Sequence, residues 1–187
     1  MQTGRARSCL FNAQELQQVL RAMAADLAPW VRSCGSILLI GVLRRGAPLA
    51  DALGERLVSE QGCAPPLRVD LRVKRYADDL TLLYPDTHLE EDPRQAEKDL
   101  AGRHVLVVDD VLYSGHSILK VVEHLARKRP ASIRVATLVD RCITRLPIRA
   151  DVVGVRLQIA DGGIVECHVP PYEPEFQIVW VPPGAAS

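Results

Sequence analysis

Residues 105–117 hold the side chains best suited to bind a charged ligand, in the order Val-Leu-Val-Val-Asp-Asp-Val-Leu-Tyr-Ser-Gly-His-Ser. The apolar residues predict a buried strand that brings Asp109 and Asp110 to its carboxyl end, where α/β sheets bind ligands. Ser114 and Gly115 predict a tight turn into a helix, whose first backbone N–H groups can cradle a phosphate. An isolated Asp-Asp pair would more often be a helix cap or a solvated turn. The whole pattern instead indicates a ligand with a phosphate, a ribose whose hydroxyls contact the carboxylates, and a diphosphate balanced by Mg²⁺.

The elements expected to position this stretch alternate between strands and helices. Continuous apolar runs and apolar–polar alternation predict strands at 36–43, 69–73, 104–110, 133–139, 152–157, 164–169 and 176–181. A capping box at Asn12 and Glu15 opens the first predicted helix, which we expect to stop at Pro29. Two further helices are expected after Gly46 and after Gly115. This order implies right-handed βαβ units, and hence an α/β fold with a central, mainly parallel sheet flanked by helices.

The chain length of 187 residues predicts a single domain, residues 1–187, with one long loop and a disordered tail. The regular pattern dissolves at about 76–99, and the part from Tyr84 to Pro93 is polar and acidic. Loops of this length in compact domains are usually lids or disordered segments. The Pro-Pro-Gly sequence near the C-terminus predicts a frayed tail at about 182–187.

The composition excludes several classes of protein. Lys and Arg total 23, as do Asp and Glu, so the net charge of zero gives no general preference for nucleic acid or a membrane surface. Aromatic residues make up 4%, too few for a surface that stacks many bases. The five cysteines are scattered without zinc-like spacing, and no apolar run approaches the ~20 residues of a membrane span. With no signal-like start, these features predict reduced thiols in a cytoplasmic protein without membrane contact.

The stretch 105–117 resembles the 5-phosphoribosyl-1-diphosphate (PRPP) binding motif of type I phosphoribosyltransferases. Three further segments, Tyr76-Ala-Asp-Asp-Leu80, Leu138-Val-Asp-Arg141 and Leu146-Pro-Ile-Arg-Ala-Asp151, resemble the PyrR family of bifunctional pyrimidine operon regulators and uracil phosphoribosyltransferases. The resemblance covers roughly residues 10–181. It implies the type I phosphoribosyltransferase fold, with a small hood that binds the base and a flexible loop, here about 76–99, that closes over the site. It also implies a homodimer or a higher homo-oligomer.

The resemblance also assigns roles to individual residues. Gly41-Val-Leu-Arg-Arg-Gly46 resembles the diphosphate-binding loop of these enzymes, whereas an Arg pair at a strand end otherwise forms a surface salt bridge. The residues implied to bind PRPP are Val111, Leu112, Tyr113, Ser114, Gly115, His116 and Ser117, and those of the diphosphate loop are Leu43, Arg44, Arg45 and Gly46. Asp109, Asp110 and Arg45 are implied to be catalytic, and the two aspartates are implied to hold Mg²⁺ directly or through ligand or water.

The identity of the transferred base is implied by the residue types at Tyr113 and Asp140. Purine enzymes of this fold usually carry an acid where this chain has Tyr113, and a Lys where it has Asp140. Both residues match the pyrimidine-type family instead, so they are implied to bind uracil. The resemblance thus implies a Mg²⁺-dependent enzyme that converts uracil and PRPP to UMP and diphosphate. A phosphoribosyltransferase for another base is an alternative.

The sequence departs from the family pattern at several positions. His116 replaces an Arg of the PRPP loop and Leu43 replaces a Lys of the diphosphate loop, which predicts weaker PRPP binding or slower turnover. Proteins of this family bind the leader RNA of their operon through basic and His residues on the first helix and on the turn after the Val-Asp-Arg strand. The matching positions here carry Arg21, Ala22 and Ala25, then Cys142-Ile-Thr144, leaving Arg141, Arg145 and Arg149. Because phosphate contacts dominate RNA affinity, we favour a solvated surface over RNA binding, and an RNA-binding attenuator with lost catalysis is the other alternative.

Overall fold

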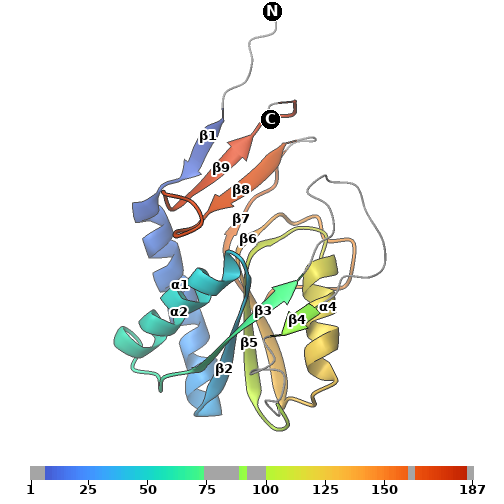
Figure 1. The fold of residues 1–187 in the computed structure, drawn as a ribbon. Coiled ribbons are helices and arrows are strands. Elements are labelled where there is room, and N and C mark those ends of the chain that lie inside the picture. The colour runs from blue at the N-terminus through green and yellow to red at the C-terminus, as the bar shows by residue number, and fades with distance from the viewer. Residues whose placement is uncertain (1–6, 74–88, 92–99, 160–162, 185–187) are drawn as a thin grey trace, which may run out of the picture.

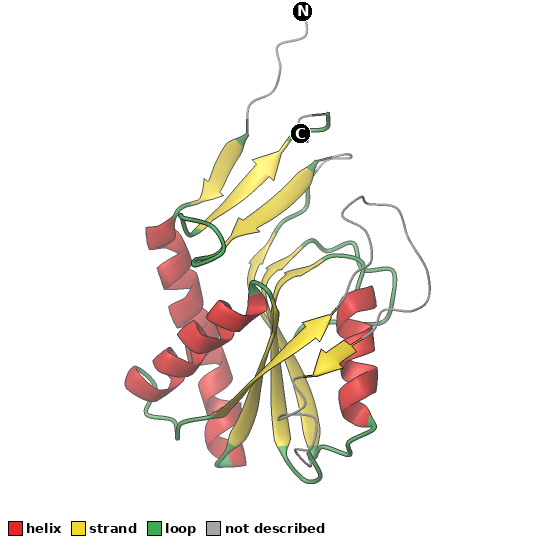
Figure 2. Ribbon diagram, viewed as in Figure 1, coloured by secondary structure: helices red, strands yellow, loops and turns green. Residues whose placement is uncertain are grey.

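The computed structural model describes residues 7–73, 89–91, 100–159 and 163–184, which form a six-stranded sheet between helices and a smaller three-stranded sheet (Figures 1 and 2). The strands of the large sheet lie in the order β4 (Leu89–Glu91), β3 (Leu67–Val73), β2 (Ile37–Leu43), β5 (His104–Leu112), β6 (Ser132–Asp140) and β7 (Val152–Arg156). All neighbours pair in parallel except β3 and β4. The helices are α1 (Ala13–Cys34), α2 (Gly46–Ser59) and α4 (His116–Ala126). This architecture confirms the predicted α/β fold with a central, mainly parallel sheet.

Both faces of the central strands are covered. Alternate residues of β2 enter different cores: Leu39 packs with α1 and α2, while Leu38 and Ile40 pack on the side of α4. These three side chains are almost fully buried, as a continuous apolar run predicts for a strand with helices on both faces. The carboxyl ends of β2 and β5 are therefore held at the middle of the sheet by two layers of packing.

Helix α1 begins as predicted and ends later than predicted. The Asn12 side chain accepts a hydrogen bond from the Glu15 N–H, and Glu15 accepts one from the Asn12 N–H, which confirms the capping box. The predicted stop at Pro29 is wrong, because the helix continues to Cys34. Pro29 and the residue one turn before it, Ala25, lie on the exposed face, where water can satisfy the Ala25 carbonyl that proline leaves without a helical donor. Burial of Val31 beyond the proline favours continuing the helix.

The smaller sheet forms the hood that the resemblance implied. Its strands lie in the antiparallel order β1 (Ser8–Phe11), β9 (Gln177–Val181) and β8 (Ile164–His168), so the two ends of the described chain meet in it (Figure 1). Strand β1 was not predicted from the sequence. Val165, Cys167 and Ile178 from the hood join the same core cluster as α1, which fixes the hood on the large sheet. Among the described residues, no helix combines the length and apolarity needed to cross a membrane.

The predicted closing loop is described only in part. Within 76–99, the residues of β4 pair with β3 in an antiparallel ladder, so this segment contains a short strand that the sequence pattern did not predict. The remaining residues of this loop lie outside the described residues, as do residues 185–187 of the predicted tail.

Candidate active site

Two loops meet where the neighbouring strands β2 and β5 end. The diphosphate loop, residues 43–46, connects β2 to α2, and the PRPP loop, residues 109–117, connects β5 to α4. Gly46 allows the two to touch, because a Cβ at this position would lie 2.4 Å from the carbonyl oxygen of Val108 and 3.1 Å from the Cα of Asp109. Gly41 is equally confined, since its Cβ would lie 2.6 Å from the Cα of Ala47. The peptide bond between Leu43 and Arg44 is cis.

The two aspartates at the end of β5 are oriented by backbone groups. The Asp110 N–H donates to Asp109 Oδ1 at 2.9 Å, and the Val111 N–H donates to Asp110 Oδ1 at 2.9 Å. Asp109 is buried and the Asp110 side chain is mostly buried. Carboxylate oxygens are the donors that Mg²⁺ prefers, so the chemistry of this pair fits a magnesium ion that takes its other ligands from a bound phosphate compound and water. Within the described ranges, no three or more His, Cys, Asp or Glu residues gather to hold a metal ion by themselves.

The start of α4 has the features of an anion site. Gly115 is the N-cap residue with φ of 90°, a left-handed conformation that glycine adopts without strain, and it has no side chain of its own to cap the first N–H groups of the helix. His116 lies exposed in the first turn, where its Nδ1 is 2.9 Å from Ser114 Oγ. Backbone N–H groups at a helix N-terminus attract anions, so this turn suits a phosphate.

The side chains of the other residues of the predicted PRPP loop differ in their exposure to solvent. Leu112 is buried in the core beside α4, and Val111 packs partly buried against the opposite core, so these two can offer a ligand mainly their backbone. Ser114 and Ser117 are partly exposed at the turn, and Tyr113 exposes about half of its surface (53%). The loop therefore combines a rigid, packed start with an accessible turn.

The two residues implied to bind the base lie at the ends of neighbouring strands. Leu112 and Asp140 are partners in the β5–β6 ladder, so Tyr113 follows directly beside Asp140. Asp140 Oδ1 accepts a hydrogen bond from the Cys142 N–H at 2.8 Å, which fixes the turn after β6. The Arg141 side chain is buried: its guanidinium carbon lies 5.6 Å from the centre of the Tyr113 ring, and its Nε donates to the carbonyl of Leu157.

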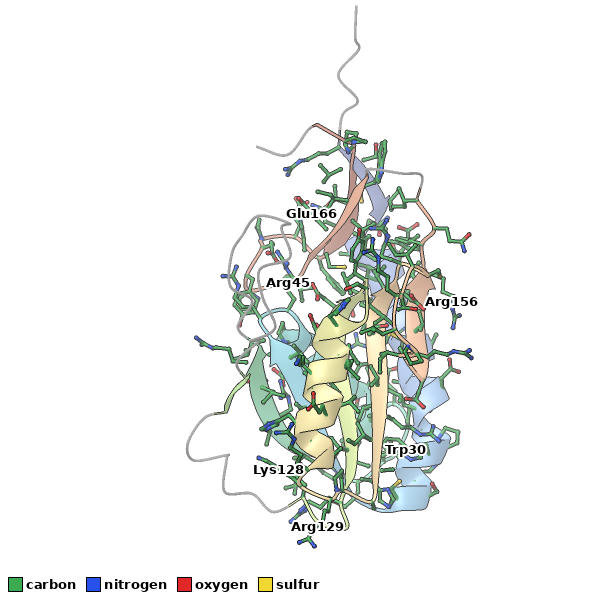
Figure 3. All side chains as sticks on the ribbon, turned by 90° about the vertical axis from the view of Figure 1, so that its right-hand side faces the viewer. Trp30, Arg45, Lys128, Arg129, Arg156 and Glu166 are labelled. Carbon is green, nitrogen blue, oxygen red and sulfur yellow. The ribbon has the colours of Figure 1, made fainter. Side chains whose placement is uncertain are left out.

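Arg45 is bound on two sides by carboxylates. Its Nε and Nη2 both donate to Glu173, with Nε–Oε1 at 3.0 Å and Nη2–Oε1 at 2.5 Å. Its Nη1 lies 3.8 Å from Asp110 Oδ2. The hydrogen bonds that Arg45 donates to Glu173 raise the pKa of Arg45 and lower the pKa of Glu173, so both groups are charged at neutral pH. Figure 3 labels Arg45 below the small sheet that carries Glu166.

The segment between β8 and β9, residues 169–176, supplies contacts that the sequence pattern did not reveal; we call it the hood loop. Glu173 binds Arg45, and the Arg44 guanidinium carbon lies 5.4 Å from the centre of the Tyr172 ring. The buried Cys167 precedes this loop, and burial together with the charge of Asp110 raises the pKa of its thiol well above the ordinary value. Arg45 and Glu173 are 128 positions apart, and no local pattern links them; an acid beside the Pro170-Pro171 turn was the one available signal.

A mainly parallel sheet with a hood, and two loops that meet beside two aspartates at a central strand end, are the features of the class of phosphoribosyltransferases. The family model described as phosphoribosyl transferase domain matches residues 11–172. The chain belongs to this family and, within it, to the group of the PyrR proteins, on the following similarities. It is 34% identical over 161 residues to the bifunctional protein PyrR of Deinococcus radiodurans, covering 86% of each chain. It is 31% identical over 183 residues to the bifunctional protein PyrR of Thermus thermophilus, covering 97% of this chain and 99% of that one.

Solved structures show the same fold. The hypoxanthine phosphoribosyltransferase of Trypanosoma cruzi superposes with a TM-score of 0.74 at 21% identity, covering 94% of this chain and 97% of that chain. A mutant of the same enzyme in a ternary complex with substrates gives a TM-score of 0.75 at 22% identity. The identity of these structures is low, so they support the architecture of the sheet and the hood and carry no argument about the base.

Proposed function

We propose that this protein transfers the 5-phosphoribosyl group of PRPP to uracil, forming UMP and diphosphate, with Mg²⁺ as cofactor. One observation carries the proposal most: Gly46 brings the diphosphate loop against the end of β5, so that Arg45 Nη1 lies 3.8 Å from Asp110 Oδ2. A cation for a diphosphate and a carboxylate for ribose hydroxyls thus stand side by side. The membership in the PyrR group supports a phosphoribosyltransferase, and the two loops supply the parts that this reaction needs.

The chain's own residues have separate tasks in this proposal. The backbone N–H groups at the start of α4 bind the 5-phosphate, and Asp109 and Asp110 bind the ribose hydroxyls. Arg44, Arg45 and the backbone of the diphosphate loop hold the leaving diphosphate. Asp109 and Asp110, directly or through ligand oxygens and water, hold Mg²⁺, which neutralises the leaving group when bound. Catalysis then follows from placing uracil N1 against the ribose carbon from which diphosphate departs.

Uracil is the proposed base because of Tyr113 and Asp140. Asp140 cannot supply the positive charge that a Lys would direct at a purine oxygen, and its carboxylate is engaged by the Cys142 N–H. Its placement beside the exposed Tyr113 forms one edge of a base site at the ends of β5 and β6. The PyrR relatives are named as bifunctional proteins, which supports a second role beside the transfer reaction.

The experiment is an assay of diphosphate release by the purified full chain with PRPP and Mg²⁺. Uracil, hypoxanthine, guanine and orotate are supplied separately, and only uracil is expected to give turnover and UMP. Turnover with a purine base would replace uracil by another substrate. Binding of PRPP without release of diphosphate from any base would favour a nucleotide sensor without catalysis.

An RNA-binding regulator is the second candidate, and membership in the PyrR group favours it. Two of the basic side chains at the matching positions are engaged: Arg141 is buried beside Tyr113, and Arg21 pairs with Glu60. Arg145 and Arg149 are exposed. A gel-shift titration of the protein with a structured leader RNA tests this role, and binding that loses affinity steeply as salt rises would support it.

A further inference from the structure

The hood loop contacts both cations of the diphosphate loop. Consecutive residues make the two contacts: Tyr172 lies against the guanidinium of Arg44, and Glu173 forms a bidentate pair with that of Arg45. The hood loop belongs to the small sheet and the diphosphate loop to the large one, so these contacts join the two layers at the site. The two side chains that would hold a diphosphate are therefore already in contact with the hood loop.

The donors of Arg45 are largely engaged in this arrangement. One edge of the guanidinium, Nε and Nη2, is directed at Glu173, and the remaining nitrogen, Nη1, faces Asp110. Glu173 is in turn held by its own loop, because its Oε2 accepts a hydrogen bond from the Val169 N–H at 2.8 Å. A diphosphate that approaches this edge of the guanidinium would compete with Glu173 for the same N–H groups, since phosphates and carboxylates both bind arginine through pairs of parallel N–H groups.

The balance of charge also opposes a diphosphate here. Arg45 contributes one positive charge, and Glu173 and Asp110 contribute two negative charges within 4 Å of it. A further anion at Arg45 meets both carboxylates at short range in a partly buried site, where water screens poorly. Mg²⁺ bound with the ligand can offset Asp110, which lies at the end of β5, whereas Glu173 lies on the hood.

We propose that Glu173 competes with the diphosphate group for Arg45. PRPP or free diphosphate must then displace the hood loop from the diphosphate loop in order to bind. The proposal rests on the proposed function, because it takes the diphosphate loop as the site of that group. Glu173 is in this sense a positioning residue that sets the affinity of the site for diphosphate. Because Glu173 belongs to the hood loop, displacing it would also couple diphosphate binding to the position of the hood.

The test compares Glu173→Gln with a matched control, Glu175→Gln, by isothermal calorimetry on the full-length chain. The probe is inorganic diphosphate with Mg²⁺. Glutamine keeps the size of the side chain and an oxygen that can accept from the Val169 N–H, but it removes the negative charge. Glu175 is an exposed acid in the same loop. We expect Glu173→Gln to lower the Kd for magnesium diphosphate by about tenfold, and Glu175→Gln to leave it within about twofold.

A second probe separates this effect from a general change in charge. UMP carries one phosphate and no diphosphate, so its Kd is expected to stay the same in Glu173→Gln. Diphosphate affinity that is unchanged or weaker in Glu173→Gln would overturn the proposal, and so would an equal gain in affinity for UMP.

Hydrogen exchange on the unaltered protein gives a measurement that needs no variant. Saturating magnesium diphosphate is expected to speed amide exchange across the hood loop, residues 169–176, because this loop leaves the diphosphate loop. Slower or unchanged exchange would contradict displacement. If the unaltered chain binds neither PRPP nor diphosphate, the proposed function fails together with this inference; if it binds both and Glu173→Gln binds diphosphate no better, only the inference fails.

Discussion

Gly46 and Val108 are in direct backbone contact, at a distance that admits no side chain: a Cβ on Gly46 would lie 2.4 Å from the Val108 carbonyl oxygen. The contact joins the first turn of α2 to a buried residue of β5 directly before Asp109, and it sets the separation between the diphosphate loop and the two aspartates. Backbone cannot move aside as a flexible side chain can, so the glycine is required by packing. The relative position of the two loops of the proposed site therefore depends on this close approach of α2 to β5.

Gly46→Ala is expected to push the diphosphate loop away from β5. Relieving the overlap with the Val108 carbonyl requires a backbone shift, which costs about 1–3 kcal/mol of unfolding free energy. Urea unfolding measures this loss, and kcat/KM for PRPP should fall with it. Gly54→Ala on the same helix is the control, because its Cβ would meet a leucine side chain at 3.1 Å. Equal stability of the Gly46 variant and the unaltered chain would contradict the tight contact.

Arg45→Ala removes the cation that stands between Asp110 and Glu173. We expect kcat/KM for PRPP to drop by about 10²-fold or more, because the developing charge of the leaving diphosphate loses a donor of the proposed diphosphate loop. Steady-state kinetics with varied PRPP measure the effect. Arg21→Ala is the matched control, since Arg21 forms an exposed ion pair with Glu60 far from the two loops in sequence. Activity retained within twofold by Arg45→Ala would exclude Arg45 from diphosphate binding.

The sequence predicted the large sheet well because its signals are local. Continuous apolar runs mark β2, β5 and β6, and the capping box marks the start of α1. The error at Pro29 arose because tertiary burial of Val31 outweighs the local cost of proline. Strands β1 and β4 are four and three residues long, so they carry little periodicity of their own and depend on their partners in the sheet.

The candidate site was predicted in part for the same reason. The two loops are contiguous motifs, and each follows a buried strand, so their meeting at one sheet edge follows from parallel topology. The contact of Glu173 with Arg45 depends on how the hood packs on the sheet, which no spacing encodes. The same holds for Tyr172, whose ring lies against Arg44 from a loop to which the sequence pattern assigned no role.

His116→Arg is expected to tighten PRPP binding. His116 is exposed in the first turn of α4, beside the backbone N–H groups that suit a phosphate. An arginine there adds a permanent charge that can reach the same anion, and a gain of about threefold to tenfold in affinity is reasonable for an exposed position. Calorimetry with PRPP and Mg²⁺ measures it. Lys120→Arg, one turn further along the helix, is the control. An unchanged or weaker affinity of His116→Arg for PRPP would contradict the prediction.

Removal of magnesium is expected to abolish turnover without affecting the fold. Asp109 and Asp110 add negative charge to a site that must take a polyanion, so PRPP binding should require the ion. Excess chelator should stop diphosphate release, and added Mg²⁺ should restore it. The thermal midpoint of the ligand-free protein should not change, because the described part of the chain gathers no cluster of three or more possible ligands. Full turnover in the presence of chelator would contradict a role for the ion.

Glu173 is expected to make the free energy of unfolding fall as the pH is lowered into the acid range. Hydrogen bonds from Arg45 hold the pKa of Glu173 below its ordinary value of 4.5, so the folded chain binds this proton less readily than the unfolded chain. The stabilisation is therefore complete above pH 4.5 and is lost as the pH falls through the lower pKa of the folded state. Urea unfolding of the unaltered chain and Glu173→Gln should differ most near neutral pH and converge in acid. A difference that stays constant across this range would show that the charge of Glu173 contributes nothing, whereas convergence identifies its pair with Arg45 as the source.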